Sequence, residues 1–142
     1  MFFQASHCNF HSKFGFVAFI TLASISSPVL GQIFSCFESG EVGDCSQFID
    51  AFCQSGNDIT VLNEQDNFSR CFNAPGGGFK CDLTAWNEFG TVSQNPLTAN
   101  CENVLNAIAE NCPRGGQGMN VDTSPFELRM IPNSGSCSFN GN

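Results

Sequence analysis

The chain has 142 residues and a formal net charge of −8, from 13 acidic and five basic residues. An acidic surface repels phosphate groups, so nucleic acid and anionic membranes are poor candidate partners. Both histidines, His7 and His11, precede residue 32. Without imidazole the remaining chain lacks a Ser-His-Asp triad, a Cys-His pair and an ordinary zinc centre. We therefore expect neither a metal site nor a cofactor.

Residues 1–31 have the features of a cleaved signal peptide. A weakly basic start precedes an apolar run over 14–22, and Val29 and Gly31 occupy the −3 and −1 positions that signal peptidase favours. The apolar run is short and interrupted, so a retained membrane anchor is the less favoured alternative. Cleavage would leave residues 32–142 as one secreted, extracellular domain, and we expect no part of it to insert into a membrane.

Removal of the signal peptide changes the cysteine count from odd to even. Cys8 would be lost, and the eight cysteines that remain are Cys36, Cys45, Cys53, Cys71, Cys81, Cys101, Cys112 and Cys137. In an oxidising compartment, an even number without Cys-x-x-Cys spacing or histidine partners indicates disulfides rather than metal ligands. Bridges worth roughly 2–4 kcal/mol each would be a large share of the stability of so small a domain. Their connectivity stays open.

The first expected element is a helix over residues 44–55. Asp44 and Gln47 have the spacing of a capping box at its start, and apolar residues recur one turn apart along it. An extended segment is then expected over 59–62, where β-branched residues follow one another.

A hairpin is expected next, with strands over 68–73 and 79–86 joined by a glycine-rich turn. This hairpin would set Cys71 across from Cys81. The two could bond directly, but we favour an arrangement in which both point inward and bond to the helices.

The clearest helix is expected over 97–112, because apolar and cysteine residues recur there at helical spacing and a proline follows. Thr98 is a reasonable N-cap. Residues 114–118 are expected to form a flexible turn, and 126–131 alternates as a half-buried strand does. A bridge to Cys137 would pin the tail.

Two cysteine-bearing helices packed on an antiparallel sheet make a small, disulfide-stapled α+β domain, with αβα layering as an alternative arrangement. A strand at the edge of such a sheet could pair with its counterpart in a second copy, which would give a homodimer.

Several blocks of the sequence resemble one known family. In order, they are Cys36-Phe37-Glu38-Ser39-Gly40, Cys45-Ser46-Gln47-Phe48, Phe52-Cys53, Ser69-Arg70-Cys71-Phe72-Asn73, Cys81-Asp82-Leu83-Thr84-Ala85-Trp86-Asn87, Asn100-Cys101-Glu102-Asn103-Val104-Leu105, Cys112-Pro113-Arg114-Gly115-Gly116 and Pro132-Asn133-Ser134-Gly135-Ser136-Cys137. Together they are similar to the Y3-like secreted glycan-binding proteins of mushroom-forming (basidiomycete) fungi, over essentially all of 36–137. The resemblance implies a compact αβ layered fold and carbohydrate binding. Trp86 departs from it, since a Phe is expected there in relatives.

Trp86 is the sharpest candidate for contact with a ligand. In the predicted strand it shares a face with polar side chains, and an indole ring packs well on the apolar face of a pyranose. A helix over this face would instead make Trp86 a core residue, which the usual burial of tryptophan favours. The neighbours that could bond sugar hydroxyls are Asp82, Asn87 and Glu88.

Arg70 is a further candidate, because it is predicted to share a strand face with Phe68 and Phe72. It could stack on a ring as part of a ligand site. The favoured interpretation is structural, with the arginine stem covering core phenylalanines.

Asn67-Phe68-Ser69 is the only N-glycosylation sequon after the signal peptide. Asn67 is therefore a candidate for modification in a secreted protein.

The leading hypothesis is a secreted, non-catalytic glycan-binding protein of the lectin type. The contrasting class is a secreted toxin, effector or defence protein that acts through a protein partner. A glycosidase that uses Asp82 with Glu88, or Glu38 with Glu41, is the least favoured, because no acid–base arrangement is specified.

Overall fold

The computed structural model describes residues 31–57, 62–88, 91, 93–122 and 124–138. Residues 1–30 of the predicted signal peptide and most of the predicted strand over 59–62 lie outside this part. The elements in chain order are β1 (Gln32–Cys36), the 3-10 turn η1 (Ser46–Phe48), α1 (Ile49–Asn57), β2 (Asn67–Asn73), β3 (Phe79–Trp86), α2 (Thr98–Asn111), β4 (Gly116–Asn120) and β5 (Glu127–Ser134).

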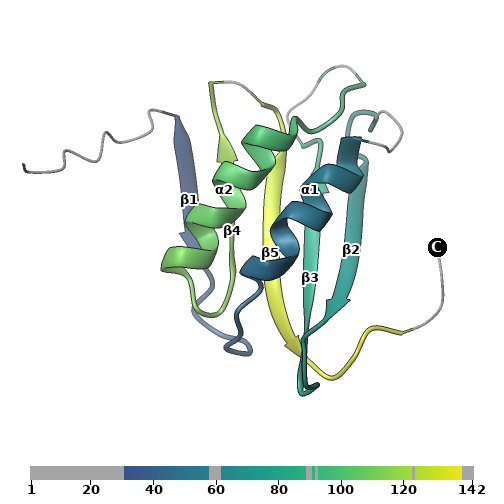
Figure 1. Ribbon diagram of the computed structural model, residues 1–142. Helices are drawn as coiled ribbons and strands as arrows, with labels where there is room; N and C mark the ends of the chain where they lie inside the picture. Colours follow the sequence, from purple (N-terminus) through teal and green to yellow (C-terminus); the bar gives the residue numbers. More distant parts are fainter. Residues whose placement is uncertain (1–30, 58–61, 89–90, 92, 123, 139–142) are drawn as a thin grey trace, which may run out of the picture.

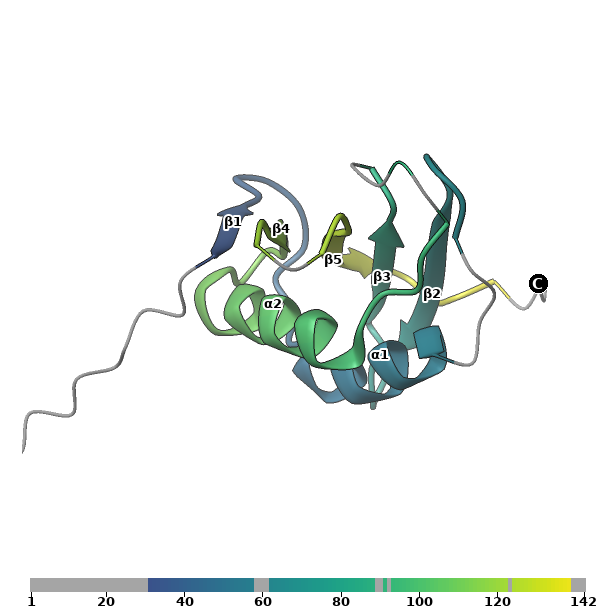
Figure 2. The same cartoon turned by 90° about the horizontal axis from the view of Figure 1, so that it is seen from above.

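The five strands form one antiparallel sheet in the order β1-β4-β5-β3-β2. Both helices lie on the same face of this sheet (Figures 1 and 2). Helix α2 packs over β1, β4 and β5 and contacts α1 beside it. The predicted α+β fold is confirmed. The described residues form two layers rather than the αβα alternative, so the second face of the sheet has no helix over it.

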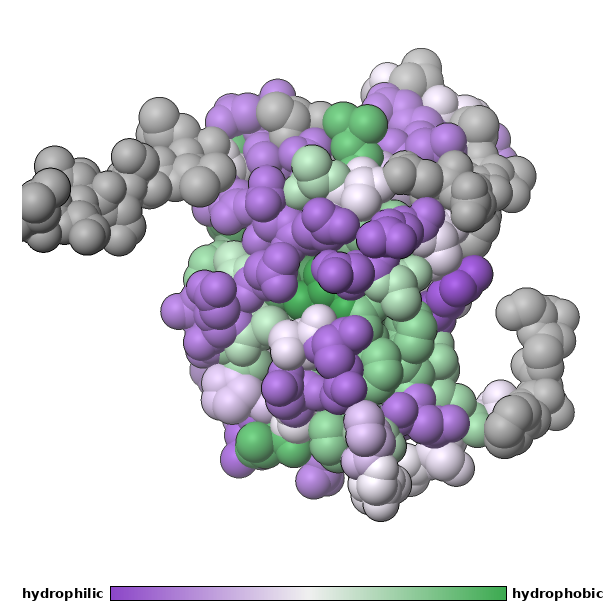
Figure 3. All heavy atoms as spheres, in the orientation of Figure 1, coloured by the Kyte–Doolittle hydropathy of each residue, from purple (hydrophilic) through white to green (hydrophobic). Residues whose placement is uncertain are grey.

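The core lies between the two helices and the sheet. Strand β3 shows this most clearly, because its buried positions alternate with half-buried ones. In the space-filling view of the helix-covered face, hydrophilic side chains predominate over α2, while hydrophobic ones show beside α1 and β2 (Figure 3). The largest fully buried side chains include Ile49, Phe52, Leu83, Leu105 and Ile108.

All eight cysteines predicted to form disulfides are paired. The bonds are Cys36–Cys112, Cys45–Cys81, Cys53–Cys101 and Cys71–Cys137. Cys81 points toward the helices, as expected, whereas the prediction for Cys71 was wrong. Phe72, not Cys71, lies opposite Cys81 in the register of β2 and β3. Because neighbouring residues of a strand point to opposite faces, Cys71 points away from the helices and bonds to the C-terminal tail.

Two strands were not predicted. Strand β1 precedes the first element expected from the sequence, and β4 begins inside the expected turn over 114–118. Glycine is a poor strand former, but a Cβ atom on Gly118 would lie 2.8 Å from the Cβ atom of Phe34 and 3.1 Å from Cγ1 of Val104. Glycine at this position therefore allows β1 and α2 to pack close to β4.

Replacement of Gly118 with valine tests this packing. Although valine favours strands, the overpacked side chain is expected to lower the free energy of unfolding by about 1–3 kcal/mol, measured by denaturant unfolding. Gln117→Val changes the adjacent residue, which faces away from α2, and should change stability by only about 0.5 kcal/mol. Similar effects of both substitutions would contradict the packing argument.

Candidate functional site

The face of the sheet opposite the helices, here called the open face, presents side chains from all five strands. The register aligns these side chains in rows across the sheet. One row runs Ile33, Met119, Glu127, Trp86 and Asn67, and the next runs Ser35, Gln117, Arg129, Thr84 and Ser69. The open face thus combines residues from distant parts of the sequence.

Trp86, the last residue of β3, lies half-buried on the open face and is not part of the buried core. Its indole Nε1 donates a hydrogen bond of 3.2 Å to the backbone oxygen of Gln65. The guanidinium carbon of Arg129 lies 5.3 Å from the centroid of its ring. The hydrogen bond from Nε1 and the contact with the Arg129 guanidinium therefore both limit rotation of the indole ring before a ligand binds.

A shallow pocket of about 300 Å³, here called the Trp86 pocket, lies beside this ring. Its wall offers an aromatic ring, a guanidinium group, a hydroxyl, a carboxamide and an aliphatic side chain. Apolar surface with a few directional polar groups is the usual composition of small-molecule sites. The lining residues are Asn67, Thr84, Trp86, Arg129 and Ile131.

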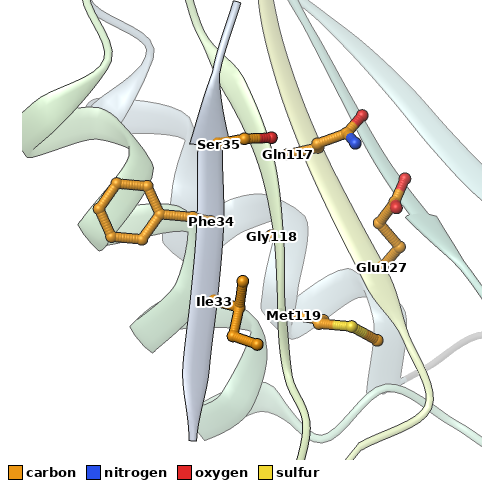
Figure 4. A pocket seen from close by; sticks show the side chains of 7 residues that line it. All are labelled: Ile33, Phe34, Ser35, Gln117, Gly118, Met119 and Glu127. Carbon is orange, nitrogen blue, oxygen red and sulfur yellow. The ribbon is translucent and has the colours of Figure 1, made fainter.

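A smaller pocket of about 120 Å³ lies between β1 and β5 (Figure 4). Phe34 points away from the other labelled side chains there, toward the helix side. Glu127 lines this pocket and stands in the same row as Trp86, so it lies between the two hollows. The lining residues are Ile33, Phe34, Ser35, Gln117, Gly118, Met119 and Glu127.

Charged side chains cluster next to Trp86. Arg129 Nε lies 2.6 Å from Glu127 Oε1, and the Glu88 carboxyl lies beside this pair with its Oε2 buried and without a hydrogen-bond partner among the described residues. Desolvation raises the pKa of Glu88 above its ordinary value of 4.5, and the negative charge of Glu127 raises it further, while Arg129 acts in the opposite direction. Burial of Glu88 and the charge of Glu127 therefore both oppose ionisation of the Glu88 carboxyl.

Glu88→Gln is expected to change how stability depends on pH. Because the pKa of Glu88 is raised in the folded protein, the stability that its protonated form contributes is complete below the ordinary pKa and is lost as pH rises through the raised one. Glutamine stays neutral throughout. Thermal unfolding should therefore show the melting temperature of the variant rising relative to wild type from acidic to neutral pH. A difference that does not change with pH would contradict the carboxyl pair.

A family model described as glycan binding domain Y3 matches residues 44–137 of the chain. The chain belongs to the Y3 family of glycan-binding domains. It is also 36% identical over 103 residues to the Antiviral protein CAP of Coprinus comatus, an alignment that covers 70% of this chain and 97% of that protein. The predicted resemblance to the Y3 family is confirmed, and carbohydrate binding of the lectin type is the function that this membership supports.

In this Y3 domain, Asp82 lies on the open face but not in the Trp86 pocket. Its carboxylate is 3.1 Å from Lys80 Nζ and accepts a hydrogen bond of 2.7 Å from Asn133 Nδ2. Four residues of strand place it about 13 Å from Trp86. Asp82 and Trp86 can therefore contact one ligand only if that ligand is extended.

Asn87 has a structural position in the Y3 domain. Its side chain is fully buried, and its Nδ2 donates to the backbone oxygens of Leu62 and Asn63, each at 3.1 Å. These bonds hold the segment before β2 against the end of β3. The expectation that Asn87 bonds a sugar is therefore corrected, because its carboxamide does not reach the open face.

Arg70 lies on the helix side of the sheet, opposite Leu83 in the register. Its guanidinium carbon is 5.5 Å from the ring centroid of Phe68, and Phe68 stacks on Phe52 with centroids 5.4 Å apart. This is the structural arrangement favoured from the sequence, and it separates Arg70 from the Trp86 pocket. Of the predicted ligand residues, only Glu88 lies in the cluster around Trp86.

Two residues beside Trp86, Glu127 and Arg129, were not predicted as site residues. The alternation over 126–131 does place both on the polar side of a strand. Only the pairing of β5 with β3, which sets Glu127 opposite Trp86 and Arg129 opposite Thr84, brings them into the site.

Proposed function

We propose that this protein is a secreted, non-catalytic lectin that binds an oligosaccharide on the open face, with Trp86 as the stacking platform. The observation that carries the proposal is the immobilised indole beside a pocket with Arg129 and Thr84 in its wall. The apolar face of a pyranose packs on the indole, and the guanidinium and hydroxyl groups bond to sugar hydroxyls. Such binding needs no metal and no cofactor.

The arrangement of the carboxyl groups favours binding without hydrolysis. Glycosidase carboxyls stand about 5 Å or more apart so that the sugar fits between them. Here the Glu127 carboxylate is paired with Arg129, and the Asp82 carboxylate bonds to Lys80 and Asn133. This supports a protein that recognises a glycan and releases it unchanged.

Secretion is supported by the four disulfides, which form and persist in oxidising compartments. Within the part of the chain that the structure describes, no helix has the length and hydrophobicity required to cross a bilayer. Cleavage after Gly31 would leave β1 as the first element of the mature protein.

A glycan array probed with the oxidised, folded protein tests the function. Binding to a limited set of glycans, abolished by an excess of the same free oligosaccharide, is the expected result. Absence of binding to every glycan on the array, with the fold intact by circular dichroism, would overturn the proposal.

A homodimer through the edge of the sheet is the proposed assembly. Strand β1 is an edge strand, and Ile33 and Phe34 in it are 61% and 38% exposed. Pairing of β1 with the same strand of a second copy would satisfy its free backbone groups and cover these side chains. Sedimentation velocity over a range of concentrations distinguishes the dimer from a monomer.

A defence role through a protein partner is the second candidate function. It is favoured by the name of the relative from Coprinus comatus, which describes an antiviral protein. A glycan-binding protein can also act in defence by binding glycoproteins, so the two functions differ in what is recognised. Loss of partner binding after the partner's glycans are removed would indicate sugar recognition, and unchanged binding would indicate protein recognition.

A further inference from the structure

The N-glycosylation sequon Asn67-Phe68-Ser69 lies at the start of β2, directly beside the Trp86 pocket. Asn67 is exposed, and β2 is the edge strand next to β3. Phe68 points toward the helices, where it stacks on Phe52. Asn67 and Ser69, its neighbours in the strand, therefore point to the open face.

Asn67 is the cross-strand partner of Trp86 and lines the same pocket. Side chains directly opposite each other in an antiparallel pair have Cβ atoms about 5 Å apart. Ser69 Oγ donates to Asn67 Oδ1 at 3.4 Å and contacts Thr84 Oγ1 at 2.8 Å. The Asn67 oxygen is thus turned toward its own strand, and its nitrogen, which would carry a glycan, is the atom left for attachment.

We propose that Asn67 carries an N-linked glycan whose first sugars lie over Trp86, so that the protein's own modification covers the pocket and weakens its binding to external glycans. This inference rests on the proposed function of the Trp86 pocket as a sugar site. The same indole that stacks on an external pyranose is available to the attached one. Because attachment makes that contact intramolecular, the local concentration of the attached sugar exceeds that of a free ligand.

The test uses the full chain produced in a eukaryotic secretory host, with two variants at one position. Ser69→Ala removes the sequon and keeps Asn67, whereas Ser69→Thr keeps the sequon and serves as its matched control. Mass spectrometry of the peptide that contains Asn67 reports occupancy. Acrylamide quenching reports the coverage of Trp86, the single tryptophan of the chain.

Wild type and Ser69→Thr should both carry a glycan and show weak quenching, while Ser69→Ala carries none and shows stronger quenching. Wild-type protein folded without glycosylation in a bacterial host should match Ser69→Ala. An unmodified Asn67 in the secreted protein, or equal quenching with and without the glycan, would overturn the inference. Quenching does not depend on an external sugar. The glycan array is probed with the Ser69→Ala protein, whose pocket carries no attached glycan, so a negative array contradicts the proposed function and leaves the quenching result standing.

Discussion

Replacement of Trp86 with alanine is expected to lower the affinity for an array-identified glycan about thirtyfold, which corresponds to about 2 kcal/mol. The substitution removes the surface on which the pyranose stacks and leaves Arg129 without the ring beside it. Trp86→Phe keeps an aromatic face and should retain part of the affinity. Isothermal titration calorimetry with the same oligosaccharide measures all three proteins.

Arg70→Ala is the matched control for this prediction. It removes one member of a cation–aromatic contact, as Trp86→Ala does, but on the helix side of the sheet, so glycan affinity should stay unchanged. Trp86→Ala should remain folded, because Trp86 is not part of the buried core. A folded Trp86→Ala protein with wild-type affinity would place the glycan site elsewhere.

Removal of the Cys53–Cys101 bond by a double alanine substitution is expected to produce the largest loss of stability. This bond joins α1 to α2 across 48 residues of sequence, and the loss of the constraint on the unfolded chain alone costs about 4 kcal/mol. Both sulfur atoms lie in the core, where the two cysteines are 1% and 2% exposed. Their removal therefore also leaves a cavity. Denaturant unfolding without reductant measures the effect.

The bond between Cys71 and Cys137 provides the comparison. It spans 66 residues, so its effect on the unfolded chain is similar, but Cys71 is exposed and lies outside the core. The double alanine variant at these positions should lose less stability than the one at Cys53 and Cys101. An equal loss would mean that burial of the α1–α2 bond contributes little.

The parts of the fold that depend on local patterns were predicted well from the sequence. The strand expected over 79–86 is β3 with the same bounds, and the helix expected over 97–112 is α2 (Thr98–Asn111). Its N-cap is Leu97 rather than Thr98. In both elements the periodicity of apolar residues matches the one face that is buried.

The site was predicted less well, because it depends on long-range pairing. Whether Trp86 is core or surface depends on which faces the helices cover, and a sequence pattern does not specify this. The proximity of Arg129 to Trp86 requires the register of β3 with β5, strands that are far apart in the sequence. Strand β4 was not predicted because it contains glycines, which are poor strand formers. Glycine is needed at Gly116 and Gly118 because neighbouring atoms leave no room for a Cβ atom there.

The two-layer arrangement also affects which positions can change as the sequences of related proteins diverge. Three of the four disulfides and the apolar core lie on the helix side, while the outward positions of β3, β4 and β5 are only half-buried. Substitutions there change stability little on average, so duplicated copies can acquire new sugar preferences on an unaltered scaffold. Diversity among relatives should therefore concentrate at the outward positions of β3 and β5, next to a conserved interior.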